Sequence, residues 1–251
     1  MSLKEKLMAG QKIAGTMLRV VRNPAVCYLA KNAGLDFVMY DCEHSNYNFE
    51  TLHDSFILAN ALGFGGFVRV PVGSKEYISR VLDAGAVGVM VPMVERREHA
   101  EELVKYSKYQ PIGSRGYTSN GGHTDYKGGK HSDLMEQGNA KVIAIAQIET
   151  RQAVDNVEVI ASVEGIDVLL VGPNDLSLSL GIPGDMMNPL ELEAIAKVAA
   201  ACKKYGKAFG IHAGPQLLEK FAADLTLTMT LSDADLLAQG FSQVYNTLQK
   251  L

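Results

Sequence analysis

The chain has 251 residues, of which 47% are hydrophobic and 21% are charged, and its formal net charge is −4. This length suits one (β/α)8 barrel, and the balance of apolar and charged residues predicts a globular protein with a sizeable core. The weak acidic charge provides no attraction to nucleic acid or to an anionic membrane, so we expect neither partner.

Strand-like runs alternate with helical patterns along the whole sequence. We expect strands at 12–20, 36–40, 66–70, 88–91, at the start of the runs 143–150 and 166–177, and at 209–212 and 225–230. Helices are expected at 3–9, 24–33, 49–62, 75–84, 95–108, 151–163, 190–205 and 232–249. This alternation, without a second compositional zone, predicts an α/β fold in which residues 1–251 form a single (β/α)8 TIM barrel. A dinucleotide-binding fold is disfavoured because no GxGxxG follows the first strand.

The segment 110–140 interrupts this alternation. Six glycines lie between Gly113 and Gly129, and the segment shows no apolar periodicity, so we expect a long loop. Residues 115–126 could face the substrate, contact another subunit or form a flexible connection, and the sequence does not choose among these roles.

The three cysteines, Cys27, Cys42 and Cys202, are widely spaced and form no CxxC pair. We therefore expect neither a disulfide framework nor a zinc knuckle, and a reducing cytoplasm fits this usage. We expect a soluble protein without a targeting segment, because the sequence contains no apolar stretch of about 18 residues and no signal-like amino terminus.

Charged and polar residues follow most of the expected strands. In a parallel barrel the carboxyl ends of all strands meet at one rim, where active sites of this fold lie. The residues expected at this rim are Arg19, Asp41, Glu43, His44, Arg69, Gln147, Glu149, Asp175 and His212.

Glu149 and Asp175 come directly after the fifth and sixth strands. Either acid alone would suit the start of a helix, where it offsets the helix dipole. As a pair on neighbouring strands they predict a site for a hard divalent cation, Mg, Mn or Co, with positions left for water or substrate.

A helix start after the sixth strand predicts a carboxylate-binding site, because its free backbone N–H groups bind anions. An α-keto acid could then bind the metal while its acid group lies on these amides. The residues expected to contact the substrate here are Gly172, Pro173, Asn174 and Asp175.

Arg69 ends the third strand and would stabilise the oxygen that becomes negative when the keto acid forms an enolate. The alternative is an ion pair with Asp41 or Glu43. His44 is the expected acid/base group, with Asp41 as its orienting partner, although a structural histidine would give the same pattern.

Seven short motifs together resemble the HpcH/HpaI aldolase family, the metal-dependent class II pyruvate aldolases that act on 4-hydroxy-2-oxo acids. The likeness covers nearly the whole chain, and the motifs are 40–44 (YDCEH), 69–71 (RVP), 82–86 (LDAGA), 91–94 (VPMV), 113–116 (GSRG), 147–150 (QIET) and 172–177 (GPNDLS).

The resemblance implies a role for each matching residue and a barrel of the phosphoenolpyruvate/pyruvate-domain type. It assigns Glu149 and Asp175 as metal ligands, and Gln147 as a substrate contact. It implies that Arg69 stabilises the enolate and that His44 with Asp41 moves the proton. It also places Asp83 near a catalytic site across a subunit boundary, in a trimer-of-dimers hexamer whose last helix is exchanged.

The chain departs from the family pattern in two places. Leu231 stands where relatives usually have glycine, and the run 121–126 has no match, so the aldehyde is not defined. We therefore expect an aldolase that reversibly cleaves a 4-hydroxy-2-oxo acid into pyruvate and an aldehyde. The alternatives are a CoA-ester lyase of the citrate lyase β-subunit or malyl-CoA type and a non-catalytic barrel that binds keto acids.

Overall fold

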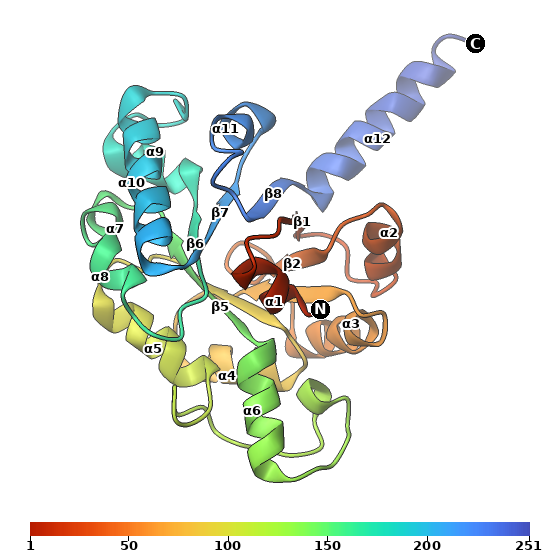
Figure 1. Cartoon of the computed structure of the whole chain (residues 1–251). Coiled ribbons are helices and arrows are strands. Elements are labelled where there is room, and N and C mark those ends of the chain that lie inside the picture. Colours follow the sequence, from red (N-terminus) through yellow and green to blue (C-terminus); the bar gives the residue numbers. More distant parts are fainter.

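The computed structural model describes residues 1–251, and its centre is a closed barrel of parallel strands in the order β1 to β8 (Figure 1). The predicted (β/α)8 barrel is therefore confirmed. The strands are β1 Ile13–Leu18, β2 Phe37–Asp41, β3 Gly65–Arg69, β4 Gly88–Val91, β5 Ile143–Ile148, β6 Val168–Val171, β7 Ala208–His212 and β8 Leu227–Ser232.

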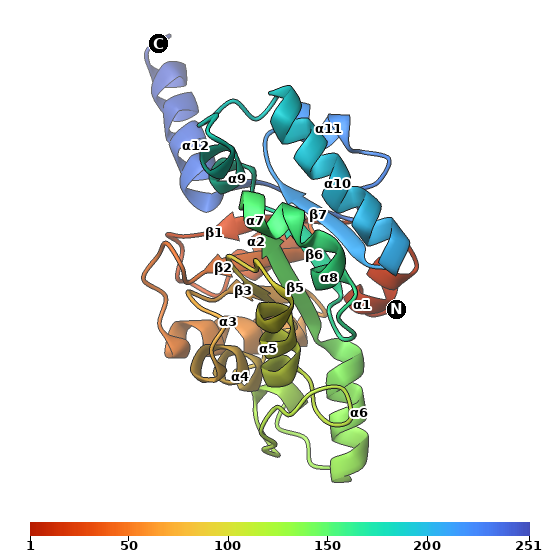
Figure 2. The ribbon, with the colours of Figure 1, turned by 90° about the vertical axis from the view of Figure 1, so that its left-hand side faces the viewer.

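Helices surround the barrel and connect successive strands (Figure 2). They are α1 Leu3–Met8, α2 Val26–Asn32, α3 Phe49–Ala61, α4 Lys75–Asp83, α5 Arg97–Ser107, α6 His131–Lys141, α7 Arg151–Asp155, α8 Val157–Ala161, α9 Pro173–Leu180, α10 Pro189–Tyr205, α11 Pro215–Lys220 and α12 Asp233–Leu248, with a short 3-10 turn at Gly122–Thr124.

Side chains of each strand alternate between the inside of the barrel and the helices around it. In β2, Phe37 and Met39 belong to the inner apolar cluster, whereas Val38 belongs to the outer one. The rings of Phe37 and Phe67 stack inside with centroids 4.4 Å apart. Gly88 leaves room for this packing, since a Cβ there would lie 2.7 Å from the Phe67 ring. The barrel interior is therefore filled, and open space is left at its rim.

Several helices differ from the sequence prediction. The segment 110–140 is not loop throughout, because α6 begins at His131 and occupies its last third. No residue of α6 is buried, so no apolar period marked this helix in the sequence. The expected helix 151–163 is divided into α7 and α8 at Asn156. The helix start expected after the sixth strand is that of α9, and the short helix α11 was not predicted.

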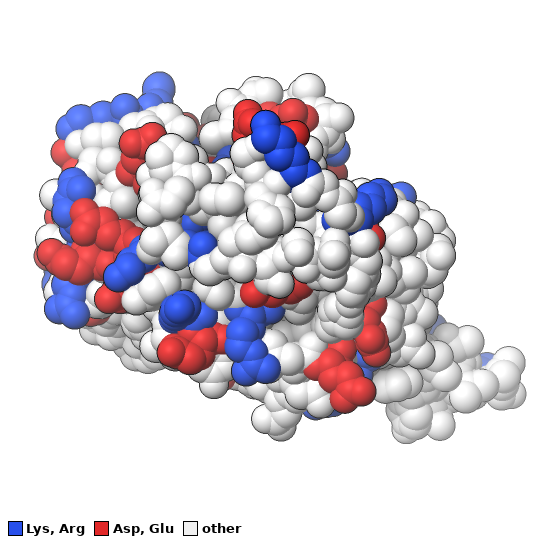
Figure 3. Space-filling model, turned by 90° about the horizontal axis from the view of Figure 1, so that it is seen from below, with Lys and Arg blue, Asp and Glu red and all other residues white.

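The last helix, α12, extends away from the barrel (Figure 1). Only its first residue, Asp233, is buried, and no charged residue lies between 236 and 249. Figure 3 shows this arm almost free of charged side chains, while acidic and basic side chains are intermixed over the rest of that face. Its exposed apolar residues are Leu236, Leu237, Phe241, Val244, Tyr245 and Leu248.

None of the helices combines the length and the apolarity that crossing a membrane requires.

Candidate active site

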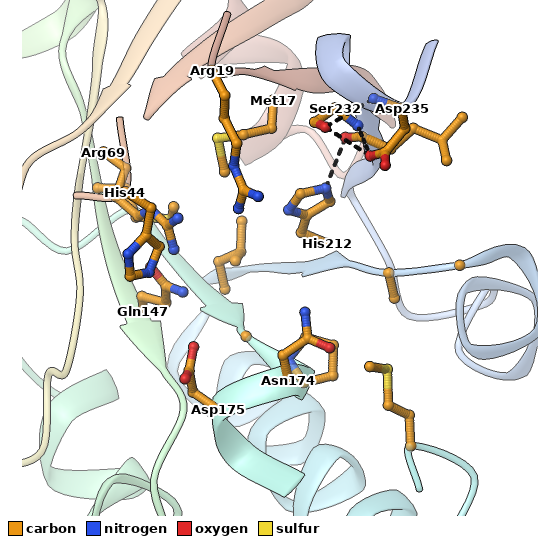
Figure 4. Close-up of a pocket in the computed structure, with 18 residues that line it drawn as sticks. Met17, Arg19, His44, Arg69, Gln147, Asn174, Asp175, His212, Ser232 and Asp235 are labelled. Atoms are coloured by element: carbon orange, nitrogen blue, oxygen red, sulfur yellow. Dashed lines mark hydrogen bonds between the residues drawn. The ribbon is translucent and has the colours of Figure 1, made fainter. Parts of the chain in front are cut away.

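A cavity of about 430 Å³ opens where the carboxyl ends of the strands meet (Figure 4). Side chains from both halves of the barrel line it, because parallel strands deliver the residues at their ends to one rim. The lining includes most of the residues that the sequence predicted for the site: His44, Arg69, Gln147, Gly172, Pro173, Asn174 and Asp175.

Arg69 is held by two carboxylates at the end of β3. Its Nε and Nη2 donate hydrogen bonds to the two oxygens of Asp41, at 3.0 and 2.8 Å, and its Nη1 lies 3.1 Å from Glu43 Oε2. Burial opposes the ionisation of Asp41, yet the hydrogen bonds and charge of Arg69 hold the pKa of this carboxyl below its usual value. From the sequence, an ion pair with Asp41 or Glu43 was the alternative role of Arg69. Both ion pairs are present, and Arg69 nevertheless lines the cavity.

His44 lies at the cavity, with 55% of its side chain exposed. Asp41 Oδ1 accepts a hydrogen bond from the backbone N–H of His44, at 3.2 Å, and the ring Nε2 instead lies 3.7 Å from Glu43 Oε2. The contact therefore differs from the expected one: Asp41 fixes the backbone that carries His44, and Glu43 is the carboxylate beside the ring.

Glu149 is buried next to the cavity wall at the end of β5. Its Oε1 accepts a hydrogen bond of 2.8 Å from the backbone N–H of Met93, and its Oε2 accepts one from Gln147 Nε2. Burial, reinforced by the negative charges of Asp175 and Glu43, raises the pKa of Glu149 to about 7. A cation at this position would stabilise the ionised form.

The backbone at Gly172 approaches this carboxylate closely. A Cβ at Gly172 would lie 2.6 Å from Glu149 Oε2 and 2.7 Å from Gln147 Nε2, so no side chain fits there without displacing one of them. Gln147 Oε1 is also buried and has no hydrogen-bond partner. An unpartnered buried oxygen of this kind indicates a site that a ligand completes.

The oxygen atoms gathered here fit a hard divalent cation. Asp175, in the first turn of α9, lines the cavity, and its charge acts on Glu149. Two carboxylates and an amide oxygen are the ligand types that Mg²⁺ or Mn²⁺ prefers. No group of three or more His, Cys, Asp and Glu side chains could enclose an ion on its own, so an ion bound by this pair would keep positions for water or substrate.

Asp83 lies apart from this cavity. It ends α4 at the opposite end of the barrel, where its Oδ1 is 2.5 Å from Arg115 Nη2. Arg115 is buried and stacks on the ring of Tyr109, 4.8 Å from its centroid. Arg115, His123 and Asp125 line a separate cavity of about 410 Å³, so within one chain the glycine-rich segment does not face the active-site cavity.

Sequence reasoning missed one carboxylate that anchors a loop beside the cavity, that of Asp233. It accepts hydrogen bonds from the consecutive backbone N–H groups of Arg19, Val20 and Val21, at 2.8, 2.9 and 2.7 Å. An acidic residue at the start of a helix is common because it offsets the helix dipole. Nothing in the sequence therefore indicated that Asp233 binds the backbone of residues 19–21.

A family model described as HpcH/HpaI aldolase/citrate lyase matches residues 17–231 of the chain. A 5-keto-4-deoxy-D-glucarate aldolase of Klebsiella pneumoniae is 36% identical over 76% of this chain and 74% of that protein. A hydroxypyruvate/pyruvate aldolase of Roseobacter denitrificans is 32% identical over 84% of this chain and 81% of that protein.

A crystal structure of an HpcH/HpaI aldolase from Desulfitobacterium hafniense superimposes with a TM-score of 0.94 at 32% identity, covering 100% of this chain and 98% of that one. The resemblance found in the sequence motifs is thus confirmed by the family model, by the curated relatives and by the fold. The chain belongs to the HpcH/HpaI aldolase/citrate lyase family and is an enzyme of the lyase class.

Proposed function

We propose that the protein is a divalent-metal-dependent aldolase that reversibly cleaves a 4-hydroxy-2-oxo acid into pyruvate and an aldehyde. The observation that carries this proposal is one cavity lined by the immobilised guanidinium of Arg69, by Gln147 and by Asp175, with Glu149 buried next to its wall. Cleavage leaves negative charge on the keto oxygen of the pyruvate fragment, and fixed positive groups stabilise such charge.

Enzymes of this family generally depend on a divalent metal, and we assign Glu149 and Asp175 as its protein ligands. When bound, the ion supplies positive charge that polarises the keto group and the carboxylate of the substrate. Oxygen ligands suit Mg, Mn and Co, and affinity order alone does not select among them.

Arg69 donates an N–H group to the keto oxygen of the substrate. Because Asp41 and Glu43 already hold the guanidinium, it needs no rearrangement as negative charge develops. His44, whose ring is exposed at the cavity, moves the proton between the aldehyde oxygen and water. Asp41 acts through Arg69 and through the backbone of His44.

The carboxylate of the oxo acid binds at the start of α9. Asn174 and Asp175 contribute free backbone N–H groups to this end of the helix, and the dipole of α9 favours an anion. Pro173 has no N–H group, and the N–H of Gly172 already donates to the carbonyl oxygen of Ile148. Gln147 completes the contact, since its amide faces the same space.

We also propose a homo-oligomer, a trimer-of-dimers hexamer in which α12 is exchanged between neighbours. The exposed apolar face of α12 supports this arrangement because such a surface is normally covered. In this assembly Asp83, which is far from the cavity of its own chain, would act near the site of a neighbouring subunit. The free cysteines fit our expectation of a cytoplasmic location.

The experiment that tests the proposed function measures pyruvate release from a panel of 4-hydroxy-2-oxo acids by chelator-treated enzyme. We expect release only after Mg²⁺, Mn²⁺ or Co²⁺ is restored, and none from folded Glu149→Gln or Asp175→Asn enzyme. Glu193→Gln, which neutralises an exposed acid on α10, is the matched control. Full activity of both site variants would contradict the metal assignment, and cleavage of CoA esters alone would favour the CoA-ester lyase.

A further inference from the structure

Glu149, one of the two assigned metal ligands, makes no ion pair and accepts only two hydrogen bonds. One comes from Gln147, which lies two residues earlier in the same stretch of chain. The other comes from the backbone N–H of Met93, 2.8 Å from Oε1. Met93 lies in the loop after β4, the strand that pairs with β5. It is therefore the contact that fixes this carboxylate from outside its own strand.

Met93 contributes through its backbone rather than through its side chain. The side chain is 42% exposed, and it does not line the active-site cavity. The backbone has a φ of 52°, in the left-handed region, which is unfavourable for a residue with a Cβ atom. Residues in such conformations persist where the surrounding contacts hold them, and they gather at functional sites.

The loop after β4 is fastened to the end of β5 and to the helices that follow it. The backbone N–H of Val94 donates to the carbonyl oxygen of Gln147, at 3.2 Å. The side chain of Glu95 accepts a hydrogen bond of 2.9 Å from the hydroxyl of Thr150. The carbonyl oxygen of Glu95 accepts one of 2.8 Å from Asn156 Nδ2. These three hydrogen bonds fix the chain directly after the left-handed residue.

The left-handed conformation and the hydrogen bond to Glu149 depend on each other. The chain after Met93 is held in place, so a change of φ to the usual negative range would rotate the preceding peptide plane, which carries the N–H group. This donor would then turn away from Oε1. Only Gln147, on the same strand, would still hold the carboxylate.

We propose that Met93 is a positioning residue for the metal centre, because its left-handed backbone directs an N–H group onto Glu149 and thereby orients this carboxylate toward the cation. The inference rests on the proposed function and adds a determinant of metal affinity to it. Hydrogen-bond partners of metal ligands have large effects of this kind, and their loss typically weakens metal binding by about 10- to 100-fold.

The test compares three substitutions of Met93 that differ in their preference for the left-handed region. Glycine and asparagine adopt this conformation readily, whereas a β-branched valine strongly disfavours it. Met93→Gly, Met93→Asn and Met93→Val are prepared without metal and titrated with Mn²⁺ at one pH and without substrate. The electron paramagnetic resonance signal of the free ion gives the dissociation constant, so the measurement does not depend on turnover.

We expect Met93→Gly and Met93→Asn to bind Mn²⁺ as the wild type does, and Met93→Val to bind it about 10- to 100-fold more weakly. A role of the apolar side chain predicts the opposite order, because valine keeps an apolar group at this position while glycine and asparagine do not. The order of the three variants therefore separates a role of the backbone from a role of the side chain.

Asn120→Val is the matched control. Asn120 also has a left-handed backbone, with a φ of 58°, but it is exposed in the glycine-rich segment and does not line the active-site cavity. This variant introduces the same unfavourable residue away from Glu149 and should leave Mn²⁺ binding unchanged. Asn156→Ala instead loosens the loop while Met93 stays in place. The loss of this hydrogen bond should weaken Mn²⁺ binding by about two- to tenfold.

Unchanged Mn²⁺ binding by folded Met93→Val, or equal losses in Met93→Gly and Met93→Val, would overturn the inference and leave the metal assignment intact. If Met93→Val does not fold, Asn156→Ala decides, and unchanged binding by that variant overturns the inference. Failure of the proposed function gives a different result. The wild-type enzyme would then bind no Mn²⁺, or would bind it equally well after Glu149→Gln, and the role of Met93 would be rejected with the metal site.

Discussion

Asp41 and Arg69 form a two-point ion pair at the floor of the cavity, with 0% of the Asp41 side chain and 6% of the Arg69 side chain exposed. Burying two charges is costly, and good geometry only offsets that cost, so removal of one partner leaves an uncompensated charge. This pair therefore links the stability of the barrel rim to the position of the proposed catalytic arginine.

Asp41→Asn should lower the free energy of unfolding by about 3–5 kcal/mol, the usual effect of breaking a buried ion pair. Both Arg69 and Arg19 lose their shared carboxylate in this variant. Urea-induced unfolding measures the change, and Asp54→Asn, which alters an exposed acid on α3, provides the control. A loss below about 1 kcal/mol would show that the pair does not stabilise the rim.

The stabilising effect of Asp41 should depend on pH in one direction. Its pKa in the folded protein lies below the usual value, so the folded state favours the ionised form more than the unfolded state does. The difference in unfolding free energy between wild type and Asp41→Asn should be full above about pH 4 and should shrink as the pH falls below that. Unfolding curves at several pH values provide the measurement, and a difference that grows on acidification would contradict the argument.

Gly172→Ala should reduce kcat/KM by about 100-fold or more while the barrel still folds. The new Cβ would lie 2.6 Å from Glu149 Oε2, so the carboxylate must move, and small displacements of catalytic groups have effects of this size. Gly116→Ala, where nothing lies within 4 Å, is the control for replacing a glycine. Steady-state kinetics with circular dichroism separate lost activity from lost structure, and unchanged kinetics would refute the close approach.

Phe241→Asp should convert the oligomer into a smaller species. Phe241 is 70% exposed on the arm formed by α12, and a charge there would oppose its burial against a neighbour. Gln239→Asp introduces the same charge on the polar side of this helix and should leave the assembly intact. Light scattering coupled to size-exclusion chromatography measures the mass, and an unchanged mass in Phe241→Asp would exclude the helix exchange.

The barrel could be predicted from the sequence because its strands are short apolar runs buried on both faces, as in 143–148 and 168–171. Helices without an apolar period were not predictable in the same way. Helix α6 buries no residue, and the six residues of α11 bury only Leu217, so neither shows an apolar period. The tertiary contacts that stabilise such helices cannot be predicted from the local sequence.

The rim residues were predictable for a similar reason, since polar residues directly after buried strands must lie at the carboxyl end of the barrel. The hydrogen-bond partners of those residues could not be predicted as well from the sequence. The sequence suggested that Asp41 orients the ring of His44, whereas Asp41 binds two arginines and the backbone N–H groups of Glu43 and His44. The contact between Asp233 and the loop after β1 joins residues more than 200 positions apart, which spacing cannot reveal.

The measurement that tests the central claim most directly is exchange of the pyruvate methyl protons into deuterated water, followed by NMR. It detects enolate formation without requiring the aldehyde to be known. We predict that chelator-treated enzyme gives no exchange, that Mg²⁺, Mn²⁺ or Co²⁺ restores it, and that folded Arg69→Gln enzyme remains inactive. Absence of exchange with every metal, in protein that circular dichroism shows to be folded, would contradict the aldolase account.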